Sequence, residues 1–180
     1  MDNTQDKIIQ ATIEWIETDD YTQLSMRKLA QKIKMTTGAI YKYFQNKDEL
    51  FYQVSIILSQ QVSQKLVINS EASAKDKLLL LADGFCQLSQ RKPKLVNFLF
   101  FNPSLHDFYH GNSNYDFKFY NQVMDLVYEV NPGGVTDQQF FVQIWSFIQG
   151  YSLLILNKTV NYDSNLVERT LNEMIRGSKK

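Results

Sequence analysis

The sequence has little that would suit a secreted, fibrous or disordered protein. Its single cysteine excludes an internal disulfide framework, and three prolines and seven glycines are too few for a fibrous or disordered chain. Nineteen basic residues balance nineteen acidic ones, so no overall field draws the chain toward nucleic acid or a membrane. Any attraction to a charged partner must therefore come from a local cluster.

Targeting and membrane signals are also missing. Residues 1–6 lack the basic and then apolar order of a signal peptide. The best apolar run, 144–156, contains Gln149 and Gly150 and is shorter than the roughly 20 residues that span a bilayer. We therefore expect a soluble, cytoplasmic protein that does not enter a membrane.

Patterns that carry catalysis are absent as well. The sequence has no nucleophile elbow and no phosphate-binding glycine loop. His106 and His110 are four residues apart, but with only Asp107 nearby they make a poor metal site. We expect no enzyme activity, no cofactor and no metal.

What the sequence does have is helical periodicity. Apolar residues recur at helical spacing throughout, and no segment alternates long enough to suggest a sheet. Ser25 predicts a helix start, Pro93 suits a first helical turn, and Asn46 with Glu49 and Thr136 with Gln139 each predict a capping box. The expected helices cover 4–17, 25–33, 36–44, 47–67, 73–89, 93–101, 115–130, 136–157 and 164–176.

Positive charge is concentrated in one short segment. Residues 21–47 hold six cations and no acidic residue, whereas the rest of the chain holds thirteen cations and nineteen acids. Two short amphipathic helices joined by a tight turn over 25–44 have the size of a helix-turn-helix unit. The second helix begins with hydroxyls, Gly38 and a methyl-sized residue, a surface that suits base edges.

A plainer reading is an ordinary solvated basic face. Gly38 argues against it, because glycine inside a helix costs about 0.5–1 kcal/mol relative to alanine and close approach of the backbone to DNA would justify that cost. The charge segregation, the helix pair and Gly38 together favour DNA binding.

Residues 8–50 resemble the N-terminal domain of the tetracycline-repressor-like (TetR/AcrR) transcriptional regulators. The resemblance rests on four segments in order: Asp20-Tyr21, 24–30 (LSMRKLA), 35–44 (MTTGAIYKYF) and 46–50 (NKDEL). It implies an all-α protein with a three-helix helix-turn-helix DNA-binding domain over 1–50, joined by the 47–67 helix to an effector-binding and dimerisation domain over 51–180.

The resemblance also implies roles for individual residues. Thr36, Thr37 and Ala39 would approach bases, and Gly38 would allow the close fit. Tyr41 and Tyr43 would contact the backbone of DNA. The remaining contacts, to phosphates or the groove edge, would come from Ser25, Arg27, Lys28, Lys34, Lys42 and Lys47.

Two positions depart from the family pattern, which has glycine where this chain has Asp20 and Lys34. Aspartate tolerates a left-handed turn better than most residues do, but lysine does not. Either the turn before the second helix of the pair differs here, or Lys34 adds a phosphate contact.

The second half of the chain is rich in aromatic residues. Ten of the twenty-four lie between Phe98 and Tyr128, which is consistent with an aromatic-lined cavity for an apolar or aromatic effector or with a bulky packed core. The candidate ligand residues are Phe98, Phe101, Tyr115, Phe119, Trp145 and Gln149. The helix over 136–157 is apolar nearly all round, so a partner subunit is expected on it, and the resemblance implies a homodimer through the last two long helices.

These observations predict a homodimeric regulator, more readily a repressor than an activator, released from a pseudo-palindromic double-stranded DNA operator by a small-molecule effector. One alternative is a DNA-binding regulator whose C-terminal domain only dimerises or binds protein. The other is a helical small-molecule-binding protein with an incidental basic face.

Overall fold

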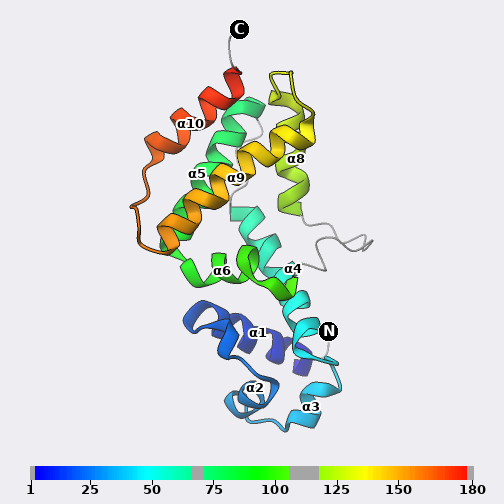
Figure 1. The fold of residues 1–180 in the computed structure, drawn as a ribbon. Helices are drawn as coiled ribbons and strands as arrows, with labels where there is room; N and C mark the ends of the chain where they lie inside the picture. The colour runs from blue at the N-terminus through cyan, green and yellow to red at the C-terminus, as the bar shows by residue number, and fades with distance from the viewer. Residues whose placement is uncertain (1–2, 66–70, 106–117, 178–180) are drawn as a thin grey trace. The chain divides into compact units, whose positions relative to one another are not determined.

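The computed structural model describes residues 3–65, 71–105 and 118–177, and the regular secondary structure in these ranges is helical (Figure 1). No strand occurs in the described residues, so the all-α prediction is confirmed. The elements, in order, are α1 (Asn3–Thr18), η1 (Tyr21–Gln23), α2 (Met26–Lys32), α3 (Thr37–Tyr41), α4 (Lys47–Lys65), α5 (Ala74–Arg91), α6 (Pro93–Phe101), η2 (Pro103–Leu105), α8 (Lys118–Val130), α9 (Asp137–Leu156) and α10 (Ser164–Arg176).

Local capping chemistry explains most of the helix starts. Ser25, Ser73 and Thr136 each accept a hydrogen bond from a backbone N–H in the first turn, which satisfies a donor that the helix cannot. At α9 the Gln139 side chain also accepts from the Thr136 backbone N–H (3.0 Å), so the predicted capping box is confirmed. Pro93 is the first residue of α6, as predicted.

Contacts divide the chain into two compact units that differ from the expected division at residue 50. The first unit is 1–61 with 94–115, and the second is 62–93 with 116–180. The α6 helix, although it follows α5 in sequence, therefore belongs with the N-terminal helices, and α4 contributes to both units.

The core of the first unit is closed by three aromatic rings from distant segments. Phe98 of α6 packs edge-on against Tyr21 (5.4 Å between ring centroids) and Phe51 (5.1 Å), and it is fully buried. The Lys94 ammonium, also on α6, donates to the backbone carbonyl of Thr18 at the end of α1. Both contacts fix α6 to the unit that carries the helix-turn-helix.

The second unit is built around α5, which packs against α8, α9 and α10. Buried Phe85 of α5 contacts Trp145 of α9 (5.4 Å between ring centroids). The connection between α9 and α10 is held by the Tyr162 hydroxyl, which donates to Asp83 of α5 (2.5 Å). Burial raises the pKa of Tyr162, and it raises the pKa of the fully buried Cys86 thiol to about 12, so both groups stay neutral.

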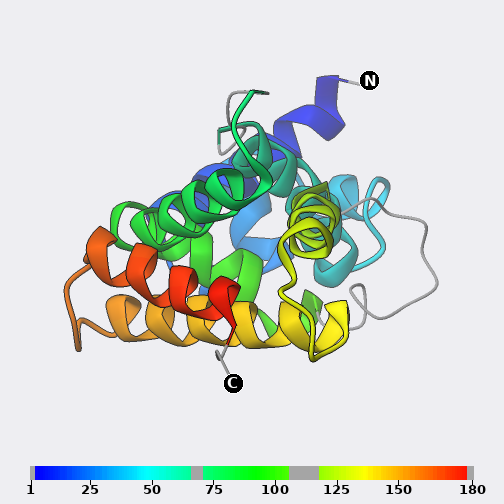
Figure 2. The ribbon, with the colours of Figure 1, turned by 90° about the horizontal axis from the view of Figure 1, so that it is seen from above.

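The α9 helix is buried on one side only. Figure 2 shows it at the outside of the second unit, with α5 and α10 on one side of it. Phe140, Ile144 and Ile148 are buried, whereas Val142, Leu153 and Leu154 are 51%, 44% and 43% exposed. The exposed side of this helix is therefore mixed, because Gln138, Gln139, Gln143 and Ser146 share it with these three apolar side chains.

Candidate nucleic-acid interface

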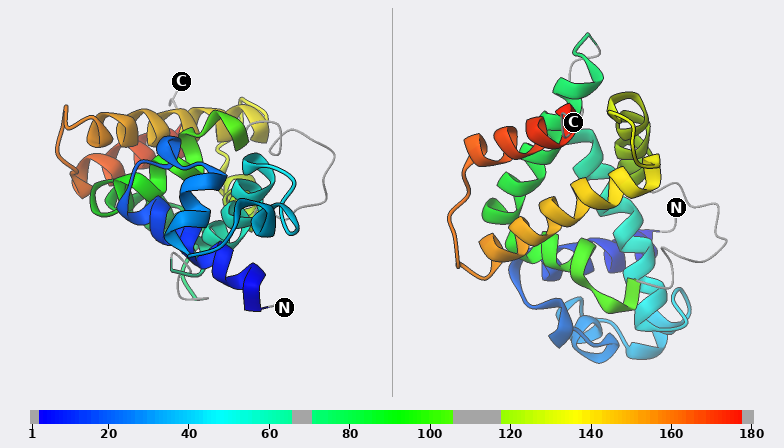
Figure 3. Two further views of the ribbon diagram at one scale, coloured as in Figure 1. Left: turned by 90° about the horizontal axis from the view of Figure 1, so that it is seen from below. Right: turned by 45° about the horizontal axis from the view of Figure 1, so that its top comes forward.

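Each helix of the α2–α3 pair begins at an N-cap residue with a side-chain hydroxyl. The left panel of Figure 3 views this pair from below. Ser25 Oγ accepts from the Lys28 N–H (3.2 Å), and Thr36 Oγ1 accepts from the Ala39 N–H (3.2 Å). A hydroxyl that accepts in this way keeps its own O–H free to donate to an external acceptor. Both predicted contact residues can therefore cap a helix and still donate a hydrogen bond to DNA.

The turn between α2 and α3 keeps a left-handed residue although glycine is absent. Lys34 has φ +56°, and the turn is closed by Lys34 N–H to the Gln31 carbonyl (3.2 Å) and Met35 N–H to the Ala30 carbonyl (2.9 Å). The turn thus uses the left-handed backbone that glycine adopts most readily, with lysine in its place. Lysine occupies a conformation that L-residues adopt at a cost.

Asp20, the other departure, does not use left-handed backbone at all. Its φ is −74°, and its carboxylate accepts from the Thr22 N–H (2.9 Å) and the Thr22 hydroxyl (2.7 Å), which caps η1. These hydrogen bonds hold the pKa of Asp20 below its usual value. Asp20 is an N-cap in extended backbone, so the position where the family has glycine needs no left-handed residue in this chain.

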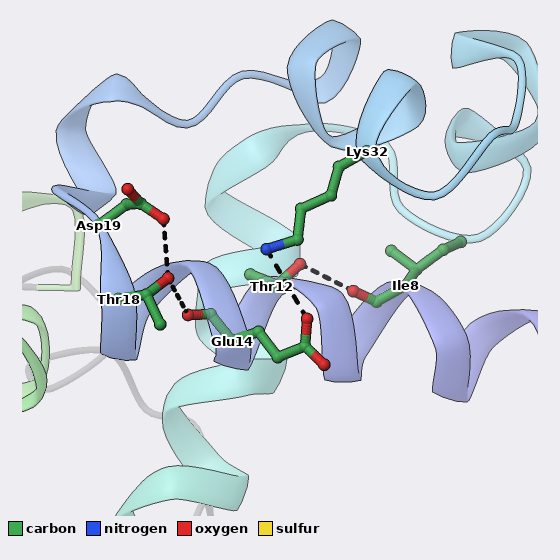
Figure 4. A network of polar contacts seen from close by, with 6 residues as sticks. All are labelled: Ile8, Thr12, Glu14, Thr18, Asp19 and Lys32. Atoms are coloured by element: carbon green, nitrogen blue, oxygen red, sulfur yellow. Dashed lines mark hydrogen bonds and ion pairs between the residues drawn. The ribbon is translucent and has the colours of Figure 1, made fainter.

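The six cations divide into two groups. The Lys32 ammonium lies 3.7 Å from a Glu14 oxygen, which joins α2 to α1 (Figure 4). It also lies over the ring of Trp15, 5.8 Å from the ring centroid. Lys47 lies over the ring of Phe51, 5.2 Å from its centroid. The others are exposed: Lys28, which donates to the Gln23 carbonyl (3.0 Å), and Arg27, Lys34 and Lys42.

Figure 4 also shows two threonine hydroxyls that bond to carbonyl groups of α1. Thr12 Oγ1 donates to the Ile8 carbonyl and Thr18 Oγ1 to the Glu14 carbonyl, both at 2.8 Å. Thr12 is fully buried, so the hydrogen bond satisfies a hydroxyl that would otherwise be costly in the core. Glu14, the ion-pair partner of Lys32, lies on the same helix between these two threonines.

The surface of α3 is small and open. Gly38 is exposed, and a Cβ added there would meet no atom within 4 Å, so packing within the chain does not require glycine. Tyr41 is 50% exposed, whereas Ile40 and Phe44 are buried. The helix ends at Tyr41, three residues earlier than predicted, because the Ile40 carbonyl accepts from the N–H groups of both Tyr43 and Phe44 and turns the chain.

The remaining predicted contacts surround this surface. Thr37, Ala39 and Tyr43 are half-buried, and Lys42 and Tyr43 follow α3 in the turn. At the start of α4, Asn46 Oδ1 accepts from the Glu49 N–H (2.8 Å), as a capping box requires. The reciprocal bond differs from the prediction, because Glu49 accepts from the Gln45 N–H (2.6 Å) and not from that of Asn46.

The predicted ligand residues do not form one group within the described residues. Phe98 is a core residue of the first unit and Phe101 is half-buried there, whereas Trp145 and Gln149 are half-buried in the second unit. Tyr115, the side chain of Phe119, and His106 and His110 lie outside the described residues. In the described ranges no three metal-ligating side chains cluster.

A cavity of about 230 Å³ lies elsewhere in the second unit, between α5 and α8. Its lining residues are Lys77, Leu81, Gln122, Asp125 and Leu126, none of which was predicted. Their spacing is that of any amphipathic helix, so the sequence held no signal for them. Ser63 of α4 donates to Gln122 (3.2 Å), which connects this wall of the cavity to α4.

The segment of the chain that carries the α2–α3 pair is similar to known proteins. Residues 8–54 match the family described as "Bacterial regulatory proteins, tetR family". A "Fatty acid metabolism regulator protein" of Bacillus subtilis is 31% identical over 77 residues, which are 42% of this chain and 40% of that protein. The chain spans between 20% and 40% of the length of the curated relatives it matches.

Solved structures match the fold over nearly the whole chain. The fatty acid degradation regulator FadR from Bacillus halodurans has a TM-score of 0.69 at 18% identity, covering 99% of this chain and 97% of that one. BioQ, crystallised with its double-stranded DNA operator, has a TM-score of 0.68 at 14% identity, covering 96% and 97%. At these identities the likeness establishes the fold.

Proposed function

The chain belongs, through residues 8–54, to the TetR family of bacterial regulatory proteins, and on that premise we propose that it is a sequence-specific DNA-binding transcriptional regulator. The observation that carries the proposal is the α2–α3 surface, where Arg27, Lys34 and Lys42 are exposed around the open backbone of Gly38. No acidic residue between 21 and 47 opposes a phosphate backbone, in a chain whose net charge is zero.

In this proposal α3 enters the major groove and the residues around it hold the DNA backbone. Thr37 and Ala39 contact base edges, with Thr36 beside them, while Gly38 lets the helix approach closely. Tyr41, Tyr43 and the Ser25 hydroxyl contact the sugar–phosphate backbone. Salt-dependent phosphate contacts come from Arg27, Lys28, Lys34, Lys42 and Lys47.

The regulator acts as a cytoplasmic homodimer through α9 and α10. Two copies of α3 then meet successive major grooves of a pseudo-palindrome, with half-sites about 34–36 Å apart. We propose repression, with release when a small-molecule effector binds the C-terminal domain and favours a dimer of different spacing. Only an effector with different affinities for the two states can do this. An apolar effector is supported by the names of two similar proteins, which concern fatty acid metabolism and degradation.

One observation favours a second candidate, a regulator whose C-terminal domain only dimerises or binds protein. The cavity between α5 and α8 is small, about 230 Å³, and three of its five lining residues are polar. An apolar effector of ordinary size needs roughly 300–1,000 Å³ of largely apolar space. A small molecule that co-purifies in the C-terminal domain would reject this second candidate and support a regulator that binds an effector.

The test is selection of bound sequences from a random duplex library at physiological salt. We expect one inverted repeat with half-sites about one helical turn apart. Binding that is indifferent to sequence and lost at physiological salt would overturn the proposal in favour of an incidental basic face.

Point variants separate the two kinds of contact. Arg27→Ala should weaken binding to all sequences and reduce the slope of log K against log salt by about one unit, whereas Thr37→Ala should change sequence preference. Arg91→Ala, an exposed cation at the end of α5, is the matched control and should leave the slope unchanged. Equal slopes for Arg27→Ala and Arg91→Ala would contradict the phosphate assignment.

A further inference from the structure

The cavity between α5 and α8 combines an apolar side with a polar one. The two helices lie side by side in the second unit (Figure 1). Leu81 of α5 and Leu126 of α8 line the cavity and are 1% and 8% exposed. Its other lining residues, Lys77, Gln122 and Asp125, are half-buried or exposed. The cavity is therefore apolar on its buried side and polar where it meets solvent.

Opposite charges line this cavity from different helices. Lys77 of α5 brings an ammonium group, and Asp125 of α8 brings a carboxylate. A ligand with a single charge would meet one of these groups with like sign, whereas a ligand with both charges can set each one beside its opposite. The pair of charges therefore favours a zwitterion over a simple anion or cation.

The Gln122 amide indicates where the negative group of such a ligand binds. The hydroxyl of buried Ser63 donates to Gln122 Oε1 (3.2 Å), so the amide oxygen is engaged within the chain. The amide then offers its Nε2 hydrogens, which suit a carboxylate. Gln122 and Lys77 together favour the carboxylate of the ligand, and Asp125 favours its ammonium group.

The volume of the cavity sets the size of the ligand. About 230 Å³ equals the space of about seven or eight water molecules at roughly 30 Å³ each. A ligand of about eight to ten non-hydrogen atoms fills that space, and about half of these atoms remain for an apolar group once the two charged groups are counted. An aliphatic group of this size covers Leu81 and Leu126 and removes apolar surface from water.

We propose that the cavity between α5 and α8 binds a free aliphatic amino acid. Its carboxylate pairs with Lys77 and its ammonium group with Asp125, while its side chain packs on the two leucines. This ligand is not the apolar effector proposed above, which needs a larger and less polar space. The inference therefore goes beyond the proposed function and is tested without DNA.

Calorimetric titration of the full chain with leucine and its analogues tests the ligand class. We expect saturable binding of leucine with a dissociation constant below about 1 mM, a modest affinity for a ligand of this size. Isoamylamine lacks the carboxylate of leucine and isocaproate lacks its ammonium group, so each should bind at least about five-fold more weakly. Glycine keeps both charges but lacks the aliphatic group, and it should bind at least about ten-fold more weakly.

Variants of the cavity assign each charge of the ligand to its partner. Asp125→Asn should bind leucine no better than isocaproate, because the ammonium group has lost its carboxylate. Lys77→Met should likewise reduce the preference for leucine over isoamylamine. Glu129→Gln, an exposed position on α8 that does not line the cavity, removes one negative charge and should keep both preferences. Circular dichroism verifies that each variant is folded.

The outcomes separate this inference from the regulator itself. Absence of saturable leucine binding by the folded chain overturns the amino-acid site. An undiminished preference for leucine over isocaproate in Asp125→Asn also overturns it, because the ligand would then bind elsewhere. Neither result concerns the α2–α3 surface, and selection from random duplexes tests the proposed regulator independently.

Discussion

Lys34 offers the sharpest test of how this helix-turn-helix is built, because strain and charge meet at one residue. The residue has φ +56° and an exposed side chain in the turn before α3. Replacing it with glycine removes the strain and the charge together, whereas alanine removes the charge and keeps the strain. Comparing Lys34→Gly with Lys34→Ala therefore isolates the contribution of backbone strain to stability from that of the charge.

The expected difference in the free energy of unfolding between these two variants is the sum of two opposing effects. Left-handed backbone destabilises the folded state by about 1–2 kcal/mol when it holds an L-residue, and glycine removes this cost. Glycine also destabilises the fold by about 0.5–1 kcal/mol, because its unfolded chain has more backbone freedom to lose. We expect Lys34→Gly to raise the free energy of unfolding by about 0.5–1 kcal/mol over Lys34→Ala. For a chain of this length that corresponds to a melting temperature higher by about 1–4 °C.

Lys158 provides a matched control far along the sequence. It follows α9 with φ +57°, so Lys158→Gly should gain the same stability over Lys158→Ala. Urea denaturation of the four variants measures this. In DNA binding the pairs should differ, since both Lys34 variants lose about one unit of salt slope and neither Lys158 variant does.

Strain at Lys34 is refuted if Lys34→Gly is no more stable than Lys34→Ala while Lys158→Gly gains stability as expected. The left-handed turn would then carry no strain at Lys34, and another explanation would be needed for lysine at this position. If both Lys34 variants keep the original salt slope, the turn is strained but its cation does not contact phosphate.

Three further predictions concern the two cores and the η1 cap. Phe98→Ala should lower the free energy of unfolding by about 3–5 kcal/mol, because it leaves a cavity against Tyr21 and Phe51, and urea denaturation should show a smaller loss for half-buried Phe100→Ala. Thr22 holds the pKa of Asp20 below its ordinary 3.8, so this carboxylate stabilises the fold above about pH 4 and the effect is lost as pH falls; thermal scans of Asp20→Asn should show a weaker decline in acid. Cys86, with its pKa raised by burial from 9.0 to about 12, should react with a thiol reagent at about pH 8 only after urea unfolds the chain.

Helix starts could be predicted because their causes are local. Ser25, Thr136 and Pro93 act on atoms within three or four residues, and the structure confirms each of them. The end of α3 could not be placed as well, because it depends on burying both Ile40 and Phe44 in a core assembled from other segments.

The segment that forms the candidate site could be predicted from the sequence. Which of its cations face outward and which contact the rest of the chain could not. Charge segregation marks 21–47 without any structure. Whether a lysine in it faces outward depends on residues elsewhere, as Lys32 shows with Glu14 and Trp15 of α1. The placement of α6 had no sequence signal either, because Phe98 finds its partners in segments far back in the chain.

That placement of α6 has a consequence for synthesis on the ribosome. Phe98 follows Phe51 by 47 residues, so translation at about 5–20 residues per second delivers it about 2–9 seconds later. During that interval the nascent helix-turn-helix segment lacks Phe98 of α6, which packs on the rings of Tyr21 and Phe51. The DNA-reading end of the protein is thus synthesised first but finished late, and a fragment ending at residue 61 should be prone to aggregate.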